Sequence, residues 1–313
     1  MMKLLISAPY FLPVLDRFRE ELEQAGFELV VPDVEERLEE SELLSIIPDI
    51  TAVIAGDDRF TRPVIEAATS LRVICKWGTG TDSFDHAACK EHGVKITNTP
   101  DAFTVPVSES VLSYALAFAR RQPWMDQAMK AGTWEKIPGR TLAESTFGIV
   151  GVGNIGSAVA RRLRAFGANV LGYDPRPISS DLIAATALSP VELPRLLAES
   201  HFVSINCDLN PSSHHLMNSE RLSLMRRDAV LINTARGPCV DERALVRALK
   251  DGEIAGAALD VFEYEPLPSD SELKSMSQVM LAPHNTNSSP RAWGHVHRNT
   301  ISNLFNALGV SAS

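Results

Sequence analysis

The alternation of short apolar runs with amphipathic stretches is the feature that most restricts how this chain folds. A first series of candidate strands, separated by helix-like segments, covers residues 3–7, 28–31, 52–55, 72–76 and 95–97. A second series covers residues 146–152, 169–173, a stretch around Ala187, 201–207, 229–234, 256–261 and 279–282. Apolar strands that alternate with helices are typical of parallel sheets covered on both faces. The sequence therefore predicts an α/β protein with two sheets.

The net charge argues against a nucleic-acid or membrane-surface protein. The chain has 30 Lys and Arg against 39 Asp and Glu, which gives a formal net charge of −9. Because it has no basic block, we expect neither nucleic acid nor anionic lipid as a partner. The most apolar run, residues 111–119, is well short of the roughly 20 residues that a membrane-spanning helix needs.

The cysteines and histidines indicate no metal site. The four cysteines form no C-x-x-C pair and no zinc-binding cluster with histidine. His295 and His297 form an H-x-H, but this spacing places them on different faces of a helix. The apolar neighbours of the cysteines indicate buried thiols in a reducing compartment, which predicts a cytoplasmic protein. The apolar LLIS near the N-terminus is interpreted as a first strand rather than a secretion signal, since Pro9 and Pro13 interrupt it early.

Residues 151–156 read G-V-G-N-I-G between a predicted strand and a predicted helix. In this setting the first glycine allows a tight turn, the second lets the backbone approach a pyrophosphate, and the third lets helix and strand pack closely. The alternative is a structural glycine turn without a nucleotide. The strand–turn–helix context favours a dinucleotide site on a helix N-terminus, formed by Gly151, Gly153, Asn154, Ile155 and Gly156.

Asp174 ends the next predicted strand, about 20 residues beyond the glycines, where dinucleotide-binding folds place an acidic residue. A carboxylate at this place accepts hydrogen bonds from the adenine ribose and repels a 2′-phosphate. This predicts NAD rather than NADP, although Arg176, two residues further on, would favour a phosphate.

A long helix is predicted near residues 105–121, and it is apolar on all sides. A helix without a polar face must be buried on both sides. It is either a central core helix or an element shared with a second copy of the chain, and the two interpretations are compatible. We therefore predict a homodimer formed through this helix.

Arg236, Glu265 and His284 each follow a predicted strand of the second series. In open parallel sheets, ligands bind at the carboxyl ends of the strands. Taken singly, Arg236 and Glu265 could be surface ion pairs and His284 a solvated loop residue. Together they indicate a site at one edge of the sheet.

These motifs, in this order, resemble the D-isomer-specific 2-hydroxyacid dehydrogenases, a family that includes D-3-phosphoglycerate, glyoxylate/hydroxypyruvate, formate and phosphite dehydrogenases. The resemblance spans nearly the whole chain. The matching segments are G-T-G-T-D at 78–82, V-S-E at 107–109, G-V-G-N-I-G at 151–156, I-N-T-A-R-G at 232–237, A-L-D-V-F-E-Y-E-P-L at 258–267 and A-P-H at 282–284.

The resemblance implies a role for each candidate site residue. His284 is implied as the general acid–base group, Glu265 as the residue that orients its imidazole, and Arg236 as the ligand of the substrate carbonyl and carboxylate. The loop of Trp77, Gly78 and Thr79 would hold the substrate carboxylate through backbone N–H groups. Besides the glycine motif and Asp174, the implied NAD-contacting positions are Thr104, Val107, Asn206, Cys207, Asp208, Thr234, Ala235 and Asp260.

The implied fold has two Rossmann-like or flavodoxin-like parallel-sheet domains with the active site in the cleft between them. Residues 99–286 would form the NAD-binding domain, and residues 1–98 with 287–313 a discontinuous substrate-binding domain. The implied activity is the NAD-dependent interconversion of a 2-oxo acid and a D-2-hydroxy acid. The alternatives are a non-catalytic, NAD-sensing interaction protein of the corepressor type and a formate or phosphite dehydrogenase.

Two segments depart from the family's pattern. Where many relatives have a Ser-Arg-Thr-like loop after the third strand, this chain has Gly56-Asp57-Asp58. A pair of carboxylates argues against a second substrate anion such as phosphate, so we expect a substrate with hydroxyls or another neutral polar group. After His284, the family's Ile-Gly-Gly is replaced by residues 285–290, N-T-N-S-S-P, which we expect to reshape the pocket beside the nicotinamide.

Overall fold

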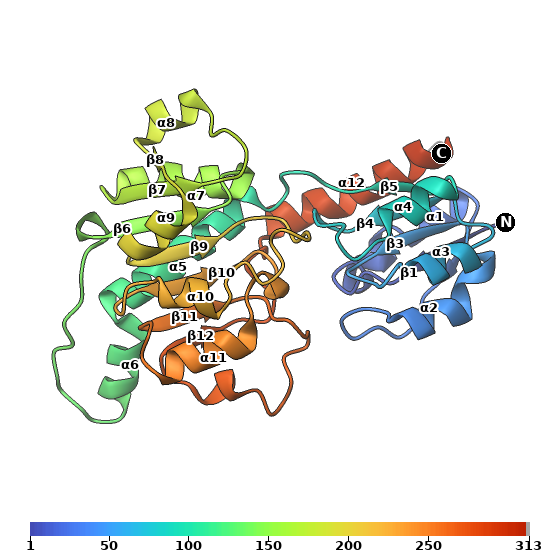
Figure 1. The fold of residues 1–313 in the computed structure, drawn as a ribbon. Coiled ribbons are helices and arrows are strands. Elements are labelled where there is room, and N and C mark those ends of the chain that lie inside the picture. The colour runs from blue at the N-terminus through green and yellow to red at the C-terminus, as the bar shows by residue number, and fades with distance from the viewer. Residues whose placement is uncertain (311–313) are drawn as a thin grey trace. The chain divides into compact units, whose positions relative to one another are not determined.

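The computed structural model describes residues 1–310 and divides into two compact units (Figure 1). Unit 1 is Met1–Phe103 together with the chain from Ser289 onward, and unit 2 is Thr104–Ser288. Each unit contains one sheet, and every strand pair in both sheets is parallel. The predicted α/β fold with two parallel sheets is confirmed.

Unit 1 has a five-stranded sheet in the order β2-β1-β3-β4-β5. Side chains alternate across it, so that Leu4 and Ile6 face one buried cluster and Leu5 faces another. Figure 1 shows the C-terminal helix α12 lying with the N-terminal strands, whose core its Val296 and Leu304 complete. The elements of unit 1 are β1 (Met2–Ile6), the 3-10 helix η1 (Leu12–Arg17), α1 (Arg19–Gln24), β2 (Phe27–Val30), α2 (Glu40–Ile46), η2 (Ile47–Asp49), β3 (Ala52–Ala55), α3 (Arg62–Ala67), β4 (Val73–Lys76), α4 (His86–Glu91), β5 (Lys95–Thr97) and α12 (Pro290–Leu308).

Unit 2 has a seven-stranded sheet in the order β12-β11-β10-β9-β6-β7-β8. One face packs on α5 and α7 through residues such as Phe147 and Ile149, and the other packs on α9 and α11. Its elements are α5 (Thr104–Arg120), α6 (Gln122–Lys130), η3 (Leu142–Glu144), β6 (Thr146–Val150), α7 (Asn154–Ala165), β7 (Asn169–Tyr173), α8 (Ser180–Thr186), β8 (Ser189–Pro190), α9 (Leu193–Glu199), β9 (Phe202–Ile205), α10 (Ser219–Ser223), β10 (Val230–Asn233), η4 (Gly237–Cys239), α11 (Glu242–Lys250), β11 (Gly256–Leu259), η5 (Glu272–Ser275) and β12 (Val279–Leu281).

Two expectations about unit 2 need correction. The strand expected around Ala187 lies at Ser189–Pro190, because Ala187 ends α8 in a left-handed conformation with φ of 56°. The helix expected to be buried on both sides has an exposed stripe within one chain, from Val105 through Glu109 to Ser113. No helix in residues 1–310 is both long and apolar enough to cross a membrane.

Candidate active site

His284 and Glu265 meet at the carboxyl edge of the unit 2 sheet, in the loops that follow β12 and β11. His284 Nδ1 lies 3.0 Å from Glu265 Oε2, and Glu265 Oε1 accepts the N–H of Phe262 at 2.9 Å. Both side chains are about one-fifth exposed. A carboxylate on Nδ1 holds the proton there, which leaves Nε2 as the atom that exchanges a proton with a ligand.

The loop of His284 is anchored by the fully buried carboxylate of Asp260. Its oxygens accept the N–H of Asn285 at 2.8 Å, and the N–H and hydroxyl of Thr286 at 3.0 and 2.5 Å. The N–H of His284 itself donates to the Asp260 carbonyl at 2.7 Å. The Asp260 carboxylate thus holds the turn that presents His284, and its expected contact with the cofactor stays a prediction. Of these donors, only the Thr286 hydroxyl comes from a side chain of the segment that departs from the family's pattern.

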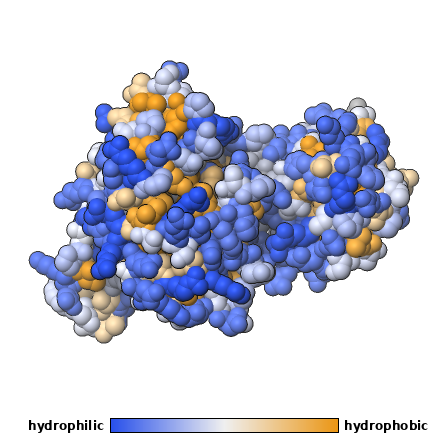
Figure 2. Space-filling model, in the orientation of Figure 1, coloured by the Kyte–Doolittle hydropathy of each residue, from blue (hydrophilic) through white to orange (hydrophobic). Residues whose placement is uncertain are grey.

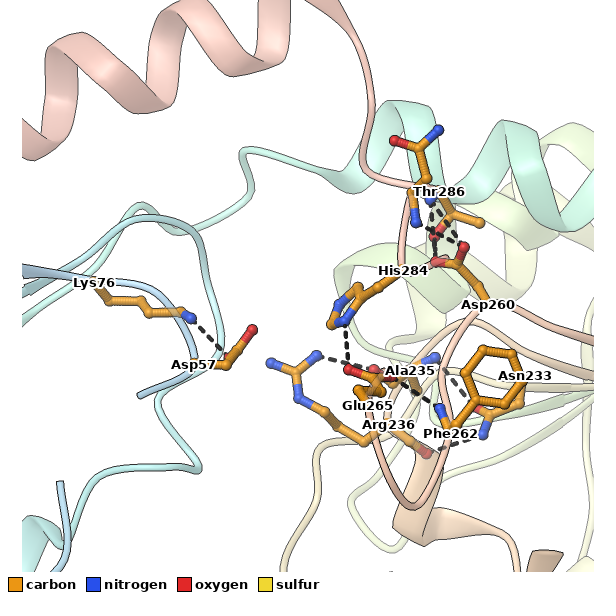
Figure 3. Close-up of polar contacts among 11 residues, drawn as sticks. Asp57, Lys76, Asn233, Ala235, Arg236, Asp260, Phe262, Glu265, His284 and Thr286 are labelled. Atoms are coloured by element: carbon orange, nitrogen blue, oxygen red, sulfur yellow. Dashed lines mark hydrogen bonds and ion pairs between the residues drawn. The ribbon is translucent and has the colours of Figure 1, made fainter. Parts of the chain in front are cut away.

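Arg236 follows β10, and two features hold the backbone of its loop: the side-chain amide of Asn233 and the absence of a side chain at Gly237. Asn233 accepts the Ala235 N–H at 3.1 Å and donates to the Arg236 carbonyl at 2.9 Å. A Cβ at Gly237 would lie 1.8 Å from the Phe262 carbonyl oxygen, so only glycine lets these two loops touch. Figure 3 shows the Arg236 and His284 side chains extending in the same direction from their loops, with the Glu265 carboxylate bonded to the imidazole.

The glycine motif forms the turn between β6 and α7. Gly151 has φ of +87°, and a Cβ there would meet the backbone of Cys207 at 2.7 Å. A Cβ at Gly156 would lie 2.1 Å from the Gly151 oxygen. Nothing lies within 4 Å of a Cβ at Gly153, and no side chain caps α7. The turn thus presents an open helix N-terminus, which fits the phosphates of a dinucleotide.

Asp174 sits beside this turn with its side chain only 7% exposed. Burial opposes ionisation, but hydrogen bonds from Arg176 and the Val152 N–H outweigh it, so the pKa of Asp174 is lowered. Arg176 donates to one carboxylate oxygen and Val152 to the other. Arg176 is therefore engaged by the acidic residue rather than held apart as a phosphate ligand. Oδ1 accepts both the backbone N–H and the Nε–H of Arg176, whereas Oδ2 accepts from Val152 and keeps accepting capacity for a ribose hydroxyl.

The other predicted cofactor positions divide into two groups. Asn206 and Cys207 follow β9 and lie against Gly151. The hydroxyl of Thr234 is buried and has no hydrogen-bond partner within residues 1–310, as expected where a polar ligand is to be bound. The remaining predicted positions stay predictions. They are Thr104 and Val107 in the first turn of α5, Asp208 in the loop after β9 and Ala235 beside Arg236.

The loop after β4 in unit 1 presents two backbone donors. Gly78 has φ of +122°, and neither Gly78 N–H nor Thr79 N–H has an acceptor within the described part of the chain. Thr99 and Asn98 hold the loop by donating to the carbonyls of Gly78 and Thr79 at 2.8 and 2.6 Å. Two adjacent N–H groups fit a carboxylate.

Trp77, the first residue of the expected substrate loop, supports this loop from the core, and a substrate contact of its own stays a prediction. Its N–H donates to Ala55 at 2.8 Å, and its indole donates to His297 at 2.9 Å. The side chain is 4% exposed and packs against Tyr10 and Trp293. His297 is thereby explained as a core residue.

The two adjacent carboxylates after β3 have different environments. Asp58 is fully buried and accepts from Ser7, Leu38 and Gly56, and burial raises its pKa against the opposing effect of these bonds. Asp57 is 35% exposed and lies 2.7 Å from the ammonium of Lys76, which is 4% exposed (Figure 3). Of the two expected carboxylates, Asp58 is therefore a buried structural residue and Asp57 is the partner of Lys76 in an ion pair. Sequence reasoning missed Lys76, although its position as the last residue of an apolar strand was the available signal.

Comparisons with known proteins agree with this geometry. The family model described as "D-isomer specific 2-hydroxyacid dehydrogenase, NAD binding domain" matches residues 112–286, more than half of the chain. A hydroxypyruvate reductase of Thermotoga maritima is 36% identical over 281 residues, covering 88% of this chain and 90% of that protein. A glyoxylate reductase of Thermofilum pendens is 40% identical over 250 residues, covering 78% and 74%.

A solved structure of D-lactate dehydrogenase from Aquifex aeolicus, complexed with NAD and lactic acid, has a TM-score of 0.88 at 26% identity. It covers 98% of this chain and 95% of that one. The chain belongs to the D-isomer specific 2-hydroxyacid dehydrogenase family. The predicted cofactor and reaction class are confirmed at this level, and the family member described here is an NAD-dependent oxidoreductase that interconverts 2-oxo acids and D-2-hydroxy acids.

The environment of Asp174 predicts how the enzyme selects its coenzyme. In the Asp174→Ala variant, Arg176 loses its partner and no carboxylate repels a 2′-phosphate. We expect the ratio of kcat/KM for NADH to that for NADPH to fall by about tenfold or more. Asp181→Ala, which removes an exposed carboxylate on α8, is the control. An unchanged ratio in the Asp174 variant would contradict the ribose contact.

Proposed function

We propose that His284 is the acid–base residue of this dehydrogenase, that Glu265 orients it and that Arg236 binds the substrate's carbonyl and carboxylate oxygens. The contact between His284 Nδ1 and Glu265 is the observation that most supports this assignment. Bound NADH supplies the hydride. Reduction of a 2-oxo acid leaves an alkoxide, which needs a proton from His284 Nε2 and a cation nearby. In the reverse direction, His284 removes the hydroxyl proton.

We further propose that unit 2 is the NAD-binding domain and that unit 1 binds the substrate carboxylate through the N–H groups of Gly78 and Thr79. The open helix N-terminus at Gly153 and the unpartnered Thr234 hydroxyl support the first assignment. The two backbone donors after β4 support the second. The chain has a net charge of −9, and backbone N–H groups can bind an anion locally without a basic surface.

The substrate's side chain is proposed to be short and uncharged, with a hydroxyl as the favoured group. Lys76 is the cation nearest the Gly78 loop along the chain, and Asp57 neutralises it at 2.7 Å. A paired, buried ammonium offers little net attraction to a second anion. Hydroxypyruvate and glyoxylate, the substrates named for two of the relatives, fit this description.

A homodimer formed through α5 is proposed. Leu112, Leu116 and Pro123 help to line a surface cavity of about 670 Å³ along α5 and α6. Trp134, which follows α6, is 88% exposed. Figure 2 shows hydrophobic surface among hydrophilic atoms where α6 lies. A second copy of the chain would cover these apolar groups. Four free cysteines support a cytoplasmic location.

The acid–base assignment predicts a selective loss of rate. We expect His284→Ala to lower kcat for 2-oxo acid reduction by about 100- to 10,000-fold, while the Kd for NADH stays nearly unchanged. His92→Ala, at the exposed end of α4, is the control. A collapse of NADH affinity would show that His284 is misassigned. Tight NADH binding without turnover of any 2-oxo acid by the unaltered protein would instead favour an NAD-sensing role.

The ion pair of unit 1 predicts how the enzyme chooses among 2-oxo acids. The unaltered enzyme is expected to prefer hydroxypyruvate or glyoxylate to 3-phosphohydroxypyruvate. Asp57→Asn removes the carboxylate that is bonded to the ammonium of Lys76, so kcat/KM for 3-phosphohydroxypyruvate relative to hydroxypyruvate should rise about tenfold. Asp49→Asn, which breaks the pair with Lys3 before β3, is the matched control. A strong preference of the unaltered enzyme for the phosphorylated substrate would refute the proposal.

The proposed dimer predicts the behaviour of surface variants in solution. Light scattering after size exclusion should give the unaltered protein a mass twice the 34.2 kDa of the chain. Leu116→Glu and Trp134→Glu place a charge on the apolar surface and should yield monomers. Leu224→Glu, at a position 40% exposed near α10, should leave the dimer intact. A monomeric unaltered protein would rule out this interface.

A further inference from the structure

Unit 2 contains a second histidine–carboxylate pair near the first, which sequence reasoning did not identify. His215 Nε2 lies 2.5 Å from Glu263 Oε1. Glu263 is 19% exposed and His215 is 38% exposed, so the contact is partly shielded from water. Glu263 precedes Glu265 by two residues in the loop after β11. The pair therefore connects the loop of Glu265 to the loop after β9, which includes His215.

The loop of His215 is fastened to the loop of Arg236 by main-chain bonds. The N–H of His215 donates to the Pro238 carbonyl at 2.7 Å. Met217 donates to Cys239 at 3.0 Å, and Asp241 donates to Met217 at 3.0 Å. His215 adopts φ of 48°, a left-handed conformation that is uncommon for residues other than glycine. The backbone of His215 is thus held in place, and its imidazole can restrain Glu263.

The loop of Glu265 has few other restraints in its central part. Phe262 is buried, but Tyr264 is 71% exposed and Pro266 is exposed as well. Polar contacts must therefore decide where Glu265 lies. Besides the bonds of Glu265 to His284 and to the Phe262 N–H, the loop is held at Glu263, whose N–H donates to Glu242 at 3.4 Å and whose carboxylate contacts His215.

We propose that His215 and Glu263 are a positioning pair for the acid–base step, a role that rests on the proposed function of Glu265 and His284. The pair ties the loop of Glu265 to the frame formed by the loops after β9 and β10. The Glu265 carboxylate is thereby kept in line with His284 Nδ1, so that Nε2 faces the reacting oxygen. His215 and Glu263 need not touch the substrate.

The first experiment is a double-mutant cycle on kcat for hydroxypyruvate or glyoxylate reduction. Glu263→Ala and His215→Asn should each lower kcat by between about 10- and 100-fold, because small misplacements of reacting groups are costly. Asparagine tolerates the left-handed backbone at position 215. The double variant should be no slower than the slower single variant, since both changes break one contact. The Kd for NADH should stay within about twofold of the unaltered value.

The second experiment separates positioning from general stability. In the background of Glu265→Ala, adding Glu263→Ala should lower kcat by less than about twofold, because the residue it positions is gone. The pH profile of kcat/KM for Glu263→Ala should resemble that of Glu265→Ala. The conservative variant Glu263→Gln keeps an oxygen that accepts from the imidazole and should recover most of the rate.

Glu199→Ala, which breaks the exposed pair with Arg195 on α9, should change none of these quantities. The thermal unfolding midpoint of each variant shows whether it is folded. If Glu263→Ala does not fold, His215→Asn replaces it in the comparison of kcat with and without Glu265. An unchanged kcat, or an equal loss with and without Glu265, would overturn the positioning role alone. An unaltered rate for Glu265→Ala itself would overturn the proposed function.

Discussion

A buried carboxylate fixes the turn on which the proposed acid–base chemistry depends. Asp260 is fully enclosed at the end of β11, where an ionised group is costly unless its oxygens are bonded. The segment after β12 supplies those bonds through Asn285 and Thr286. The carboxylate and the turn therefore stabilise each other. The same contacts hold His284 at φ of 49°, a conformation that its side chain alone would disfavour.

The loops after β9, β10 and β11 are held together by contacts between their main chains. Gly237 lies directly against the Phe262 carbonyl, and the loop after β9 bonds to the loop after β10 through Pro238 and Cys239. Because these loops are held by main-chain contacts, their side chains are left to face a ligand. Arg236 and Glu265 are in addition each bonded within their own loop, Arg236 through its carbonyl to Asn233 and Glu265 through its carboxylate to the Phe262 N–H.

The sequence was sufficient to predict the two sheets and the place of Arg236, Glu265 and His284, because strand period and strand ends are local properties. It could not show which acidic residues are buried. Asp57 and Asp58 are adjacent and identical in type, yet one is partly exposed and the other is enclosed. Nor could the sequence show that Asp260 and Trp77, which matched family positions for ligand contact, also bond to this protein's own backbone and core. The contact of His215 with Glu263 joins residues far apart in sequence, so no spacing rule indicated it.

The charge distribution of unit 1 is consistent with the proposed binding of a carboxylate by a protein without a basic surface. Lys76 lies behind the loop of Gly78, with its Cε 3.8 Å from the place of a Gly78 Cβ, and its charge is balanced by Asp57. Burial makes an unpaired ammonium costly, so the ion pair is what permits a lysine at this position. With the cation neutralised, the N–H groups of Gly78 and Thr79 remain as the donors of this loop. Such donors recognise the shape of a carboxylate rather than the total charge of the molecule, and an additional anionic group would find no counter-charge there.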